Sequence, residues 1–154
     1  MKSNVIKALA LFSLLAFGNA SAKSTLQLNN AWIRATPPNT QVAGGFVEII
    51  NQGKDDRLLS ITSSLSSSVE IHEMKMDGDV MQMRQLKDGL QIPGKEITAL
   101  KPGSVHLMFM QPKQSLSVGQ KITAIFVFAK TGKREVVFTV LKSAPVAESN
   151  GHEH

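Results

Sequence analysis

Methionine and histidine are concentrated in one part of the 154-residue chain, between residues 72 and 110. The stretch VEIHEMKMDGDVMQM, residues 69–83, contains one histidine and four methionines, and VHLMFM, residues 105–110, contains one histidine and two methionines. Thioether sulfur is a soft ligand that selects Cu(I) over zinc, calcium or magnesium, and imidazole also suits copper. A single methionine is more simply explained as core filling. Six methionines grouped with both histidines that precede the C-terminal tail indicate instead a site for a soft metal ion.

The first of these stretches is predicted to form a β-hairpin. Asp77-Gly78 is a two-residue turn signal of type I′, and it is flanked by residues that alternate in character. With that loop, His72 faces Met83 across the hairpin. Facing side chains have Cβ atoms about 4.5–5.5 Å apart, which is close enough for the two to share one ion.

A turn placed one residue later is the alternative for this hairpin. With Gly78-Asp79 as the loop, Met74 instead of His72 faces Met83. Both loops leave these side chains on the same side of the sheet, because side chains alternate between faces with a period of two. A three-residue loop would break this relation, so the prediction depends on the length of the turn.

The second stretch supplies another histidine–methionine pair. His106 and Met108 are two residues apart on an expected strand, so both project to one face, and Met110 continues that face. If the two stretches converge, two imidazoles and two thioethers surround one point. This neutral set can bind one Cu(I) ion per chain without gathering negative charge. The candidate ligands are His72, Met83, His106 and Met108.

Cysteine is absent from the chain. A blue-copper electron-transfer centre needs a cysteine thiolate with two histidines, so that class is excluded. Zinc-finger sites, iron–sulfur sites and thiol nucleophiles are excluded with it. We also do not expect an enzyme, because no segment resembles a nucleophile elbow and neither internal histidine lies beside a candidate nucleophile in the sequence.

Charge gives little indication of a macromolecular partner. The chain has 17 basic and 12 acidic residues, for a formal charge of +5. The basic residues are scattered and are not interleaved with aromatic residues, so they do not form a track for a phosphate backbone. Nucleic-acid binding is therefore not expected.

Residues 1–22 have the pattern of a secretory signal peptide. Two lysines are followed by an apolar run over residues 8–17 and by the small residues Ala20-Ser21-Ala22. The run is shorter than the roughly 20 residues that span a bilayer. No cysteine follows it, so we expect neither a membrane span nor a lipid anchor. The mature chain is expected to begin at Lys23 and to be periplasmic.

Residues 23–142 are predicted to form a single all-β domain, a sandwich or a barrel. Short β-rich runs alternate with turn signals, and no segment has a sustained helical period. Residues 143–154 have little to bury and are expected to be a mobile tail outside the fold. The protein is expected to be a monomer. The predicted strands lie within residues 24–36, 44–53, 56–64, 69–76, 80–86, 90–92, 95–100, 104–110, 120–130 and 133–142.

The spacing of the candidate ligands resembles that of the periplasmic copper chaperones called PCu(A)C. Their signature is a histidine, ten residues, a methionine, about twenty-one residues, and then His-x-Met. Ten residues separate His72 from Met83, and His106-Leu107-Met108 supplies the last motif. The gap from Met83 to His106 is 22 residues, one more than usual, and the extra residue is placed in the turn-rich segment 87–96. AWIRATPP, VEIHEM and LKPGSVHLMFM extend the resemblance over nearly the whole mature chain.

The resemblance implies a cupredoxin-like Greek-key β-barrel that binds one Cu(I) through these four side chains. It also implies delivery of copper to the binuclear copper centre of a respiratory haem–copper oxidase, either to the oxidase subunit or alongside a thiol-based assembly factor. Extended tails in similar proteins suggest an auxiliary Cu(II) site at His152 and His154. Two solvated histidines near the chain end are the alternative for the tail.

Two other readings use the same residues. A periplasmic copper buffer or resistance protein would have the same Cu(I) ligands, because ligand identity does not distinguish delivery from storage. A β domain with only a structural role would leave the clustering of methionine with histidine without a cause. The methionines outside the four-residue signature are expected to form an apolar collar around the ligands. They are Met74, Met76, Met81 and Met110.

Overall fold

The computed structural model describes residues 25–145 and shows an all-β chain, as the sequence predicts. The described part contains ten strands and no helix, so no helix in it is long and apolar enough to cross a membrane. The expected signal peptide lies outside the described residues, as do His152 and His154. The strands are β1 (Leu26–Arg34), β2 (Val42–Asn51), β3 (Asp56–Ser63), β4 (Ser68–Asp77), β5 (Val80–Gln85), β6 (Leu90–Ile92), β7 (Glu96–Leu100), β8 (His106–Met110), β9 (Lys121–Phe128) and β10 (Gly132–Leu141).

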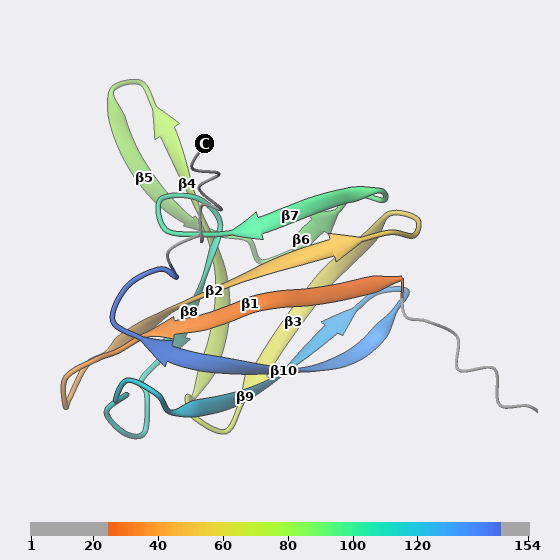
Figure 1. Ribbon diagram of the computed structural model, residues 1–154. Helices are drawn as coiled ribbons and strands as arrows, with labels where there is room; N and C mark the ends of the chain where they lie inside the picture. Colours follow the sequence, from red (N-terminus) through yellow and green to blue (C-terminus); the bar gives the residue numbers. More distant parts are fainter. Residues whose placement is uncertain (1–24, 146–154) are drawn as a thin grey trace, which may run out of the picture.

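Seven of these strands form a closed ring (Figure 1). The order along the sheet is β4-β8-β2-β1-β10-β9-β3, and a pairing between Ile61 of β3 and Val69 of β4 closes it. All pairings are antiparallel except that between β1 and β10, the first and last strands, which run parallel. β5, β6 and β7 pair with β4, β3 and β2 from outside the ring.

The ring encloses an apolar core because side chains alternate along its strands. In β8, Leu107 and Phe109 are fully buried, whereas the three residues that alternate with them, His106, Met108 and Met110, are only partly buried. Phe109 meets Phe138 of β10 edge to face, with 5.6 Å between ring centroids. Burying an aromatic side chain of this kind contributes about 1.5–3 kcal/mol to folding. The alternation places the histidine and methionines of β8 on the outer side of the sheet.

The β4–β5 hairpin has the later of the two predicted turns. Asp77 pairs with Val80, so the loop is Gly78-Asp79. Gly78 has a φ of 61°, and neither aspartate beside it has a positive φ. A type I′ turn at Asp77-Gly78 requires positive φ at both residues, whereas a type II′ turn requires it only at its first central position. The turn is therefore built around Gly78 as its first central residue.

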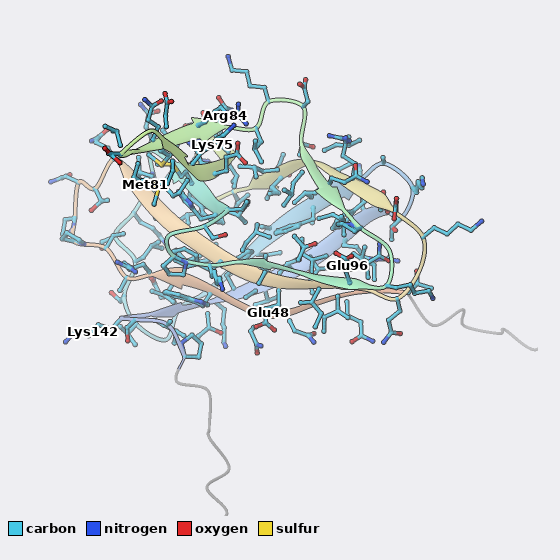
Figure 2. All side chains as sticks on the ribbon, turned by 90° about the horizontal axis from the view of Figure 1, so that it is seen from above. Glu48, Lys75, Met81, Arg84, Glu96 and Lys142 are labelled. Atoms are coloured by element: carbon cyan, nitrogen blue, oxygen red, sulfur yellow. The ribbon has the colours of Figure 1, made fainter. Side chains whose placement is uncertain are left out.

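The hairpin extends beyond the ring of strands. All six residues of β5 are exposed, and so is the outer end of β4. Viewed from above, Lys75, Met81 and Arg84 lie at one side of the molecule, away from Glu96 on β7 (Figure 2). The outer end of the hairpin thus presents both of its faces to solvent.

Candidate metal centre

The two internal histidines face one another on neighbouring strands. His72 of β4 is paired with His106 of β8, and their ring centroids are 6.2 Å apart. Both lie on the outer side of the sheet, because the residues that alternate with them, Ile71 and Leu107, are buried in the core. The predicted convergence of the two stretches is therefore present at the histidines.

A carboxylate holds the ring of His72. Glu70, two residues earlier on the same strand, lies with its Oε2 atom 2.7 Å from Nε2 of His72. An ionised carboxylate only accepts hydrogen bonds, so we assign the ring proton to Nε2. Nδ1 then carries the lone pair, and this buried atom has no hydrogen-bond partner. Such an unsatisfied buried nitrogen is suited to a metal ion.

His106 is oriented in a corresponding way from the adjoining loop. Its Nδ1 lies 2.9 Å from the carbonyl oxygen of Ser104. Because a carbonyl oxygen accepts, Nδ1 donates its proton and leaves the lone pair on Nε2. Fixing the tautomer through the second ring nitrogen is the usual arrangement of histidines that bind metals.

The predicted thioether ligands lie on opposite sides of this histidine pair. Met108 faces Glu70 across the β4–β8 ladder and is diagonal to His72. Met83 faces Met74 across the β4–β5 ladder and is also diagonal to His72. The prediction that His72 directly faces Met83 is therefore wrong: its partner on β5 is Gln85, because the turn begins at Gly78. Diagonal neighbours are about 7–8 Å apart, within reach of long side chains.

His72 is the centre of this group. It faces His106 directly and has both Met83 and Met108 as diagonal neighbours. Its side chain is 14% exposed, whereas Met83 is 51% exposed. Met83 is therefore an exposed sulfur on one side of a largely buried imidazole, where a ligand can leave and return. Met108 lies on the other side, on β8, and is partly buried. The two methionines are neighbours of His72 but not of one another, because they face different residues of β4, Met74 and Glu70.

A shallow pocket of about 330 Å³ connects part of this group. Met83, Met74 and His106 line it together with Phe46 of β2 and Arg34 of β1. Phe46 packs on Trp32 with 4.4 Å between ring centroids, which gives the pocket a rigid aromatic wall. Met108 lies beyond the histidines, opposite Gly44.

Sequence reasoning did not identify three participants in this site: Glu70, Met74 and Phe46. Glu70 had a detectable signal, because it lies two residues from His72 on a strand and so shares its face. Met74 was assigned only to an apolar collar. Phe46 had no local signal, because its position beside His106 arises from the pairing of β2 with β8, far apart in the sequence.

Within residues 25–145, no three His, Asp or Glu side chains are grouped so that they could hold a metal ion. The side chains beside the two imidazoles that could add ligands are the thioethers of Met83 and Met108. Thioether ligands favour Cu(I) over the hard divalent cations.

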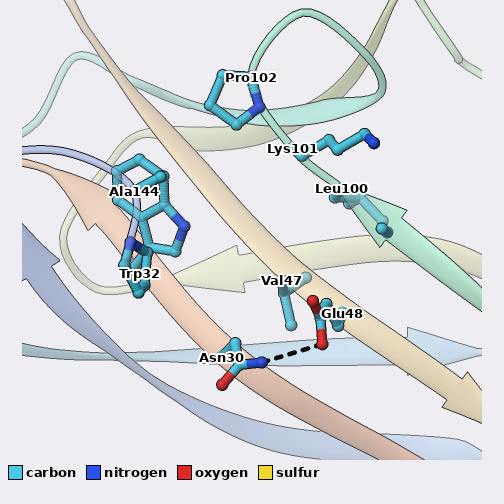
Figure 3. Close-up of a pocket in the computed structure, with 10 residues that line it drawn as sticks. Asn30, Trp32, Val47, Glu48, Leu100, Lys101, Pro102 and Ala144 are labelled. Atoms are coloured by element: carbon cyan, nitrogen blue, oxygen red, sulfur yellow. Dashed lines mark hydrogen bonds between the residues drawn. The ribbon is translucent and has the colours of Figure 1, made fainter. Parts of the chain in front are cut away.

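A second pocket, of about 310 Å³, shares Pro102 in its lining with the first (Figure 3). It is lined by Trp32, Leu100 and Glu48, and Asn30 donates a 3.0 Å hydrogen bond to the Glu48 carboxylate. Its lining contains neither methionine nor histidine. This pocket therefore has none of the soft ligands found at the histidine pair.

Most of the domain matches a known protein family. Residues 26–140 match the family described as "Putative lipoprotein LpqE-like". The putative lipoprotein Lxx21020 of Leifsonia xyli subsp. xyli is 30% identical over 105 residues, which are 68% of this chain and 62% of that protein. The uncharacterized protein RP573 of Rickettsia prowazekii is 29% identical over 65% of this chain and 55% of its own length. The chain thus spans less than two thirds of these curated relatives.

Solved structures share the fold at lower identity. The copper-bound PCuAC domain from PmoF2 has a TM-score of 0.64 and 21% identity, covering 79% of this chain and 95% of that domain. The solution structure of CuI-DR1885 from Deinococcus radiodurans has a TM-score of 0.63 and 20% identity, covering 84% and 85% of the two chains. These similarities confirm the predicted cupredoxin-like fold.

Proposed function

The chain belongs to the LpqE-like family and has the fold of PCuAC copper-chaperone domains, and from this premise we propose that it is an exported Cu(I) chaperone. In this proposal one Cu(I) ion is the cargo of each chain. Its ligands are His72, Met83, His106 and Met108. The proposal assigns no catalytic step to the protein.

The observation that carries the proposal is the paired histidines with thioethers on both sides. Nδ1 of His72 and Nε2 of His106 are the nitrogens left without a proton by their partners, Glu70 and the Ser104 carbonyl. Met83 and Met108 flank His72 diagonally. Two solved relatives of the same fold, from PmoF2 and Deinococcus radiodurans, are described as bound to copper and to Cu(I).

The donor set suits an ion that has to be released. Imidazole and thioether are neutral, so the complex keeps the single charge of Cu(I), and thioethers need no proton to dissociate. Met83 lies on an exposed hairpin strand that pairs with β4. An incoming ligand from a partner can therefore displace the sulfur while the histidines still hold the ion.

The proposed recipient is the copper centre of a respiratory oxidase, reached directly or through a thiol-based assembly factor. Thiolate ligands on such a partner bind Cu(I) more strongly than thioethers, which gives the transfer its direction. A periplasmic copper buffer with the same site is the second candidate, because storage requires the same ligands.

Anaerobic competition titration of the mature protein with a Cu(I) chelator tests the site. We expect one Cu(I) bound per chain. His72→Ala should weaken binding the most, because His72 adjoins every other ligand. His106→Ala, Met83→Leu and Met108→Leu should each weaken it less.

Met110→Leu is the matched control for the sulfur ligands, since Met110 lies on β8 two residues beyond Met108, opposite Val42 and Ser68. Circular dichroism of each variant establishes that the fold is retained. If Met83→Leu and Met108→Leu bind Cu(I) as tightly as Met110→Leu does, the thioether assignment is wrong.

Delivery and storage are separated in cells that lack the protein. A chaperone predicts loss of copper from the oxidase at ordinary copper supply, restored by added copper. A buffer predicts intact oxidase and sensitivity to excess copper. The second result would reject the delivery role and would be compatible with the proposed Cu(I) site.

A further inference from the structure

Two methionines at the hairpin tip have no role in the site described above. Met76 of β4 faces Met81 of β5, two pairings beyond Met74 and Met83 and on the same face of the hairpin. Met76 is 53% exposed and Met81 is 52% exposed. The hairpin extends beyond the ring of strands, so these side chains do not fill the core (Figure 1). Core filling, the usual role of methionine, therefore does not explain them.

The hairpin separates sulfur from charge between its two faces. Met74, Met76, Met81 and Met83 project to the face that also carries His72; we call this the thioether face. The other face carries Glu73 paired with Arg84, and Asp77 accepting a hydrogen bond from Gln82. If the hairpin only had to be soluble, four methionines on one of its faces would not be needed.

The spacing of the thioether face suits movement of a metal ion along it. Facing side chains have Cβ atoms about 4.5–5.5 Å apart, so each pair can close on one ion. The two pairs are two residues apart along each strand, about 7 Å. Methionine has three rotatable bonds, so its sulfur can swing between neighbouring positions.

We propose that Met76 and Met81 form a second Cu(I) site at the hairpin tip, built from thioethers alone, which receives the ion and passes it through Met74 and Met83 to the histidines. The ion stays Cu(I) throughout, and each step exchanges one thioether for another donor without moving a proton or an electron. The passage to the histidines rests on the function proposed above, whereas binding at the tip does not.

The soft-ligand chemistry of the tip makes it selective. Thioethers bind Cu(I) and the similar ion Ag(I), and they have little affinity for Cu(II) or Zn(II). Neutral sulfur ligands also do not titrate, so the tip should bind Ag(I) equally at neutral and mildly acidic pH.

Methyl-labelled methionine makes binding at the tip directly visible. We would titrate Ag(I) into the full mature chain carrying His72→Ala and His106→Ala, with His152→Ala and His154→Ala to silence the tail. Methyl resonances of the tip methionines should shift with Ag(I), and the resonance of Met110 should not. Absence of a shift at Met76 and Met81 would reject the tip site, whatever the histidine variants show for Cu(I).

A kinetic measurement tests the passage to the histidines. Met76→Leu with Met81→Leu keeps apolar volume and removes sulfur, an exchange that proteins tolerate well. We expect unchanged Cu(I) affinity at the histidine site but several-fold slower loading from a Cu(I) donor in stopped flow, relative to Met110→Leu. Unchanged loading would show that the thioether face acts by apolar contact, as a docking surface for a protein, and would overturn the relay.

Discussion

At the scale of single residues, Glu70 sets the chemical state of the metal site. Its carboxylate accepts from Nε2 of His72 and so leaves Nδ1 as the nitrogen with a lone pair. Outer residues of this kind orient a ligand and raise its basicity. Loss of the Glu70 carboxylate would act on the metal through His72, so Glu70 is a positioning residue and not a ligand.

Glu70→Ala is predicted to lower Cu(I) affinity by roughly 10–100-fold, the usual effect of losing such a partner. Alanine is used because the amide oxygen of a glutamine could still accept from Nε2. Glu73→Ala is the matched control, because it removes the same charge from the opposite face, where Glu73 pairs with Arg84. Chelator competition measures the affinity, and ¹⁵N NMR of His72 reports which ring nitrogen carries the proton. An unchanged tautomer in Glu70→Ala would contradict this role.

The residue types of the site were predictable from the sequence, but their exact neighbours were not. Clustering of methionine with histidine identified the two stretches that meet. The hydrogen bond from His72 to Glu70 depends on side-chain rotamers, which spacing alone does not determine. The exposure of Met83 depends on where the hairpin lies relative to the ring, a property of the whole fold.

At the scale of elements, the turn at Gly78 decides which methionine faces which residue. The ten predicted segments correspond to the ten observed strands, because Pro, Gly and Asp mark their ends strongly. The turn was predicted at Asp77-Gly78, one residue before its observed position at Gly78-Asp79. Asp-Gly favours type I′ only when both residues adopt positive φ, and here Asp77 continues the strand instead.

Gly78→Ala is predicted to loosen the hairpin and leave the ring intact. A Cβ at Gly78 meets no atom within 4 Å, so the cost is the positive φ of 61°, about 1–2 kcal/mol for an L-residue. Amides of β5 should then exchange with solvent roughly 5–30-fold faster, as measured by hydrogen exchange. Gly119→Ala is the control, with a φ of 92° and equally open space. Equal protection of β5 in both variants would reject the hairpin as an independently opening unit.

At the scale of the whole molecule, Asp56 joins two segments of the barrel that are far apart in the sequence, the start of β3 and the turn between β9 and β10. Its buried carboxylate accepts hydrogen bonds from the backbone N–H of Arg57, Lys130 and Thr131 and from the Thr131 hydroxyl. Burial raises the pKa of Asp56, but these hydrogen bonds together lower it further, so the pKa lies below its usual value.

The lowered pKa gives a prediction with a definite sign. The ionised Asp56 stabilises the fold at any pH above its unfolded value of about 3.9, and this contribution is lost as the pH falls through the folded value. Asp56→Asn should lower the free energy of unfolding by about 1–3 kcal/mol at pH 7, and the difference should shrink in strong acid. Urea denaturation at both pH values measures it, with the exposed Asp88→Asn as control. A difference that stays constant with pH would contradict the ionised state.

Closure of the ring is the part of the fold that local sequence signals could not predict. Two contacts complete it: the parallel pairing of β1 with β10, and the short pairing between Ile61 and Val69. In both contacts, the alternation of apolar and polar residues along each strand would be compatible with several other partner strands. Only the packing of the common core, including Phe109, Phe126 and Phe138, selects between them.

The parallel pairing of β1 with β10 also decides where the chain enters and leaves the barrel. Arg34, at the end of β1, is paired with Leu141 and lines the pocket that contains His106. The first strand therefore starts at Leu26 on the pole remote from the histidines, and the last strand ends at Leu141 on the pole beside them. An affinity handle or fluorophore fused ahead of Leu26 would leave copper exchange unobstructed. A polyhistidine handle placed after Leu141 would bring competing imidazoles next to the ion.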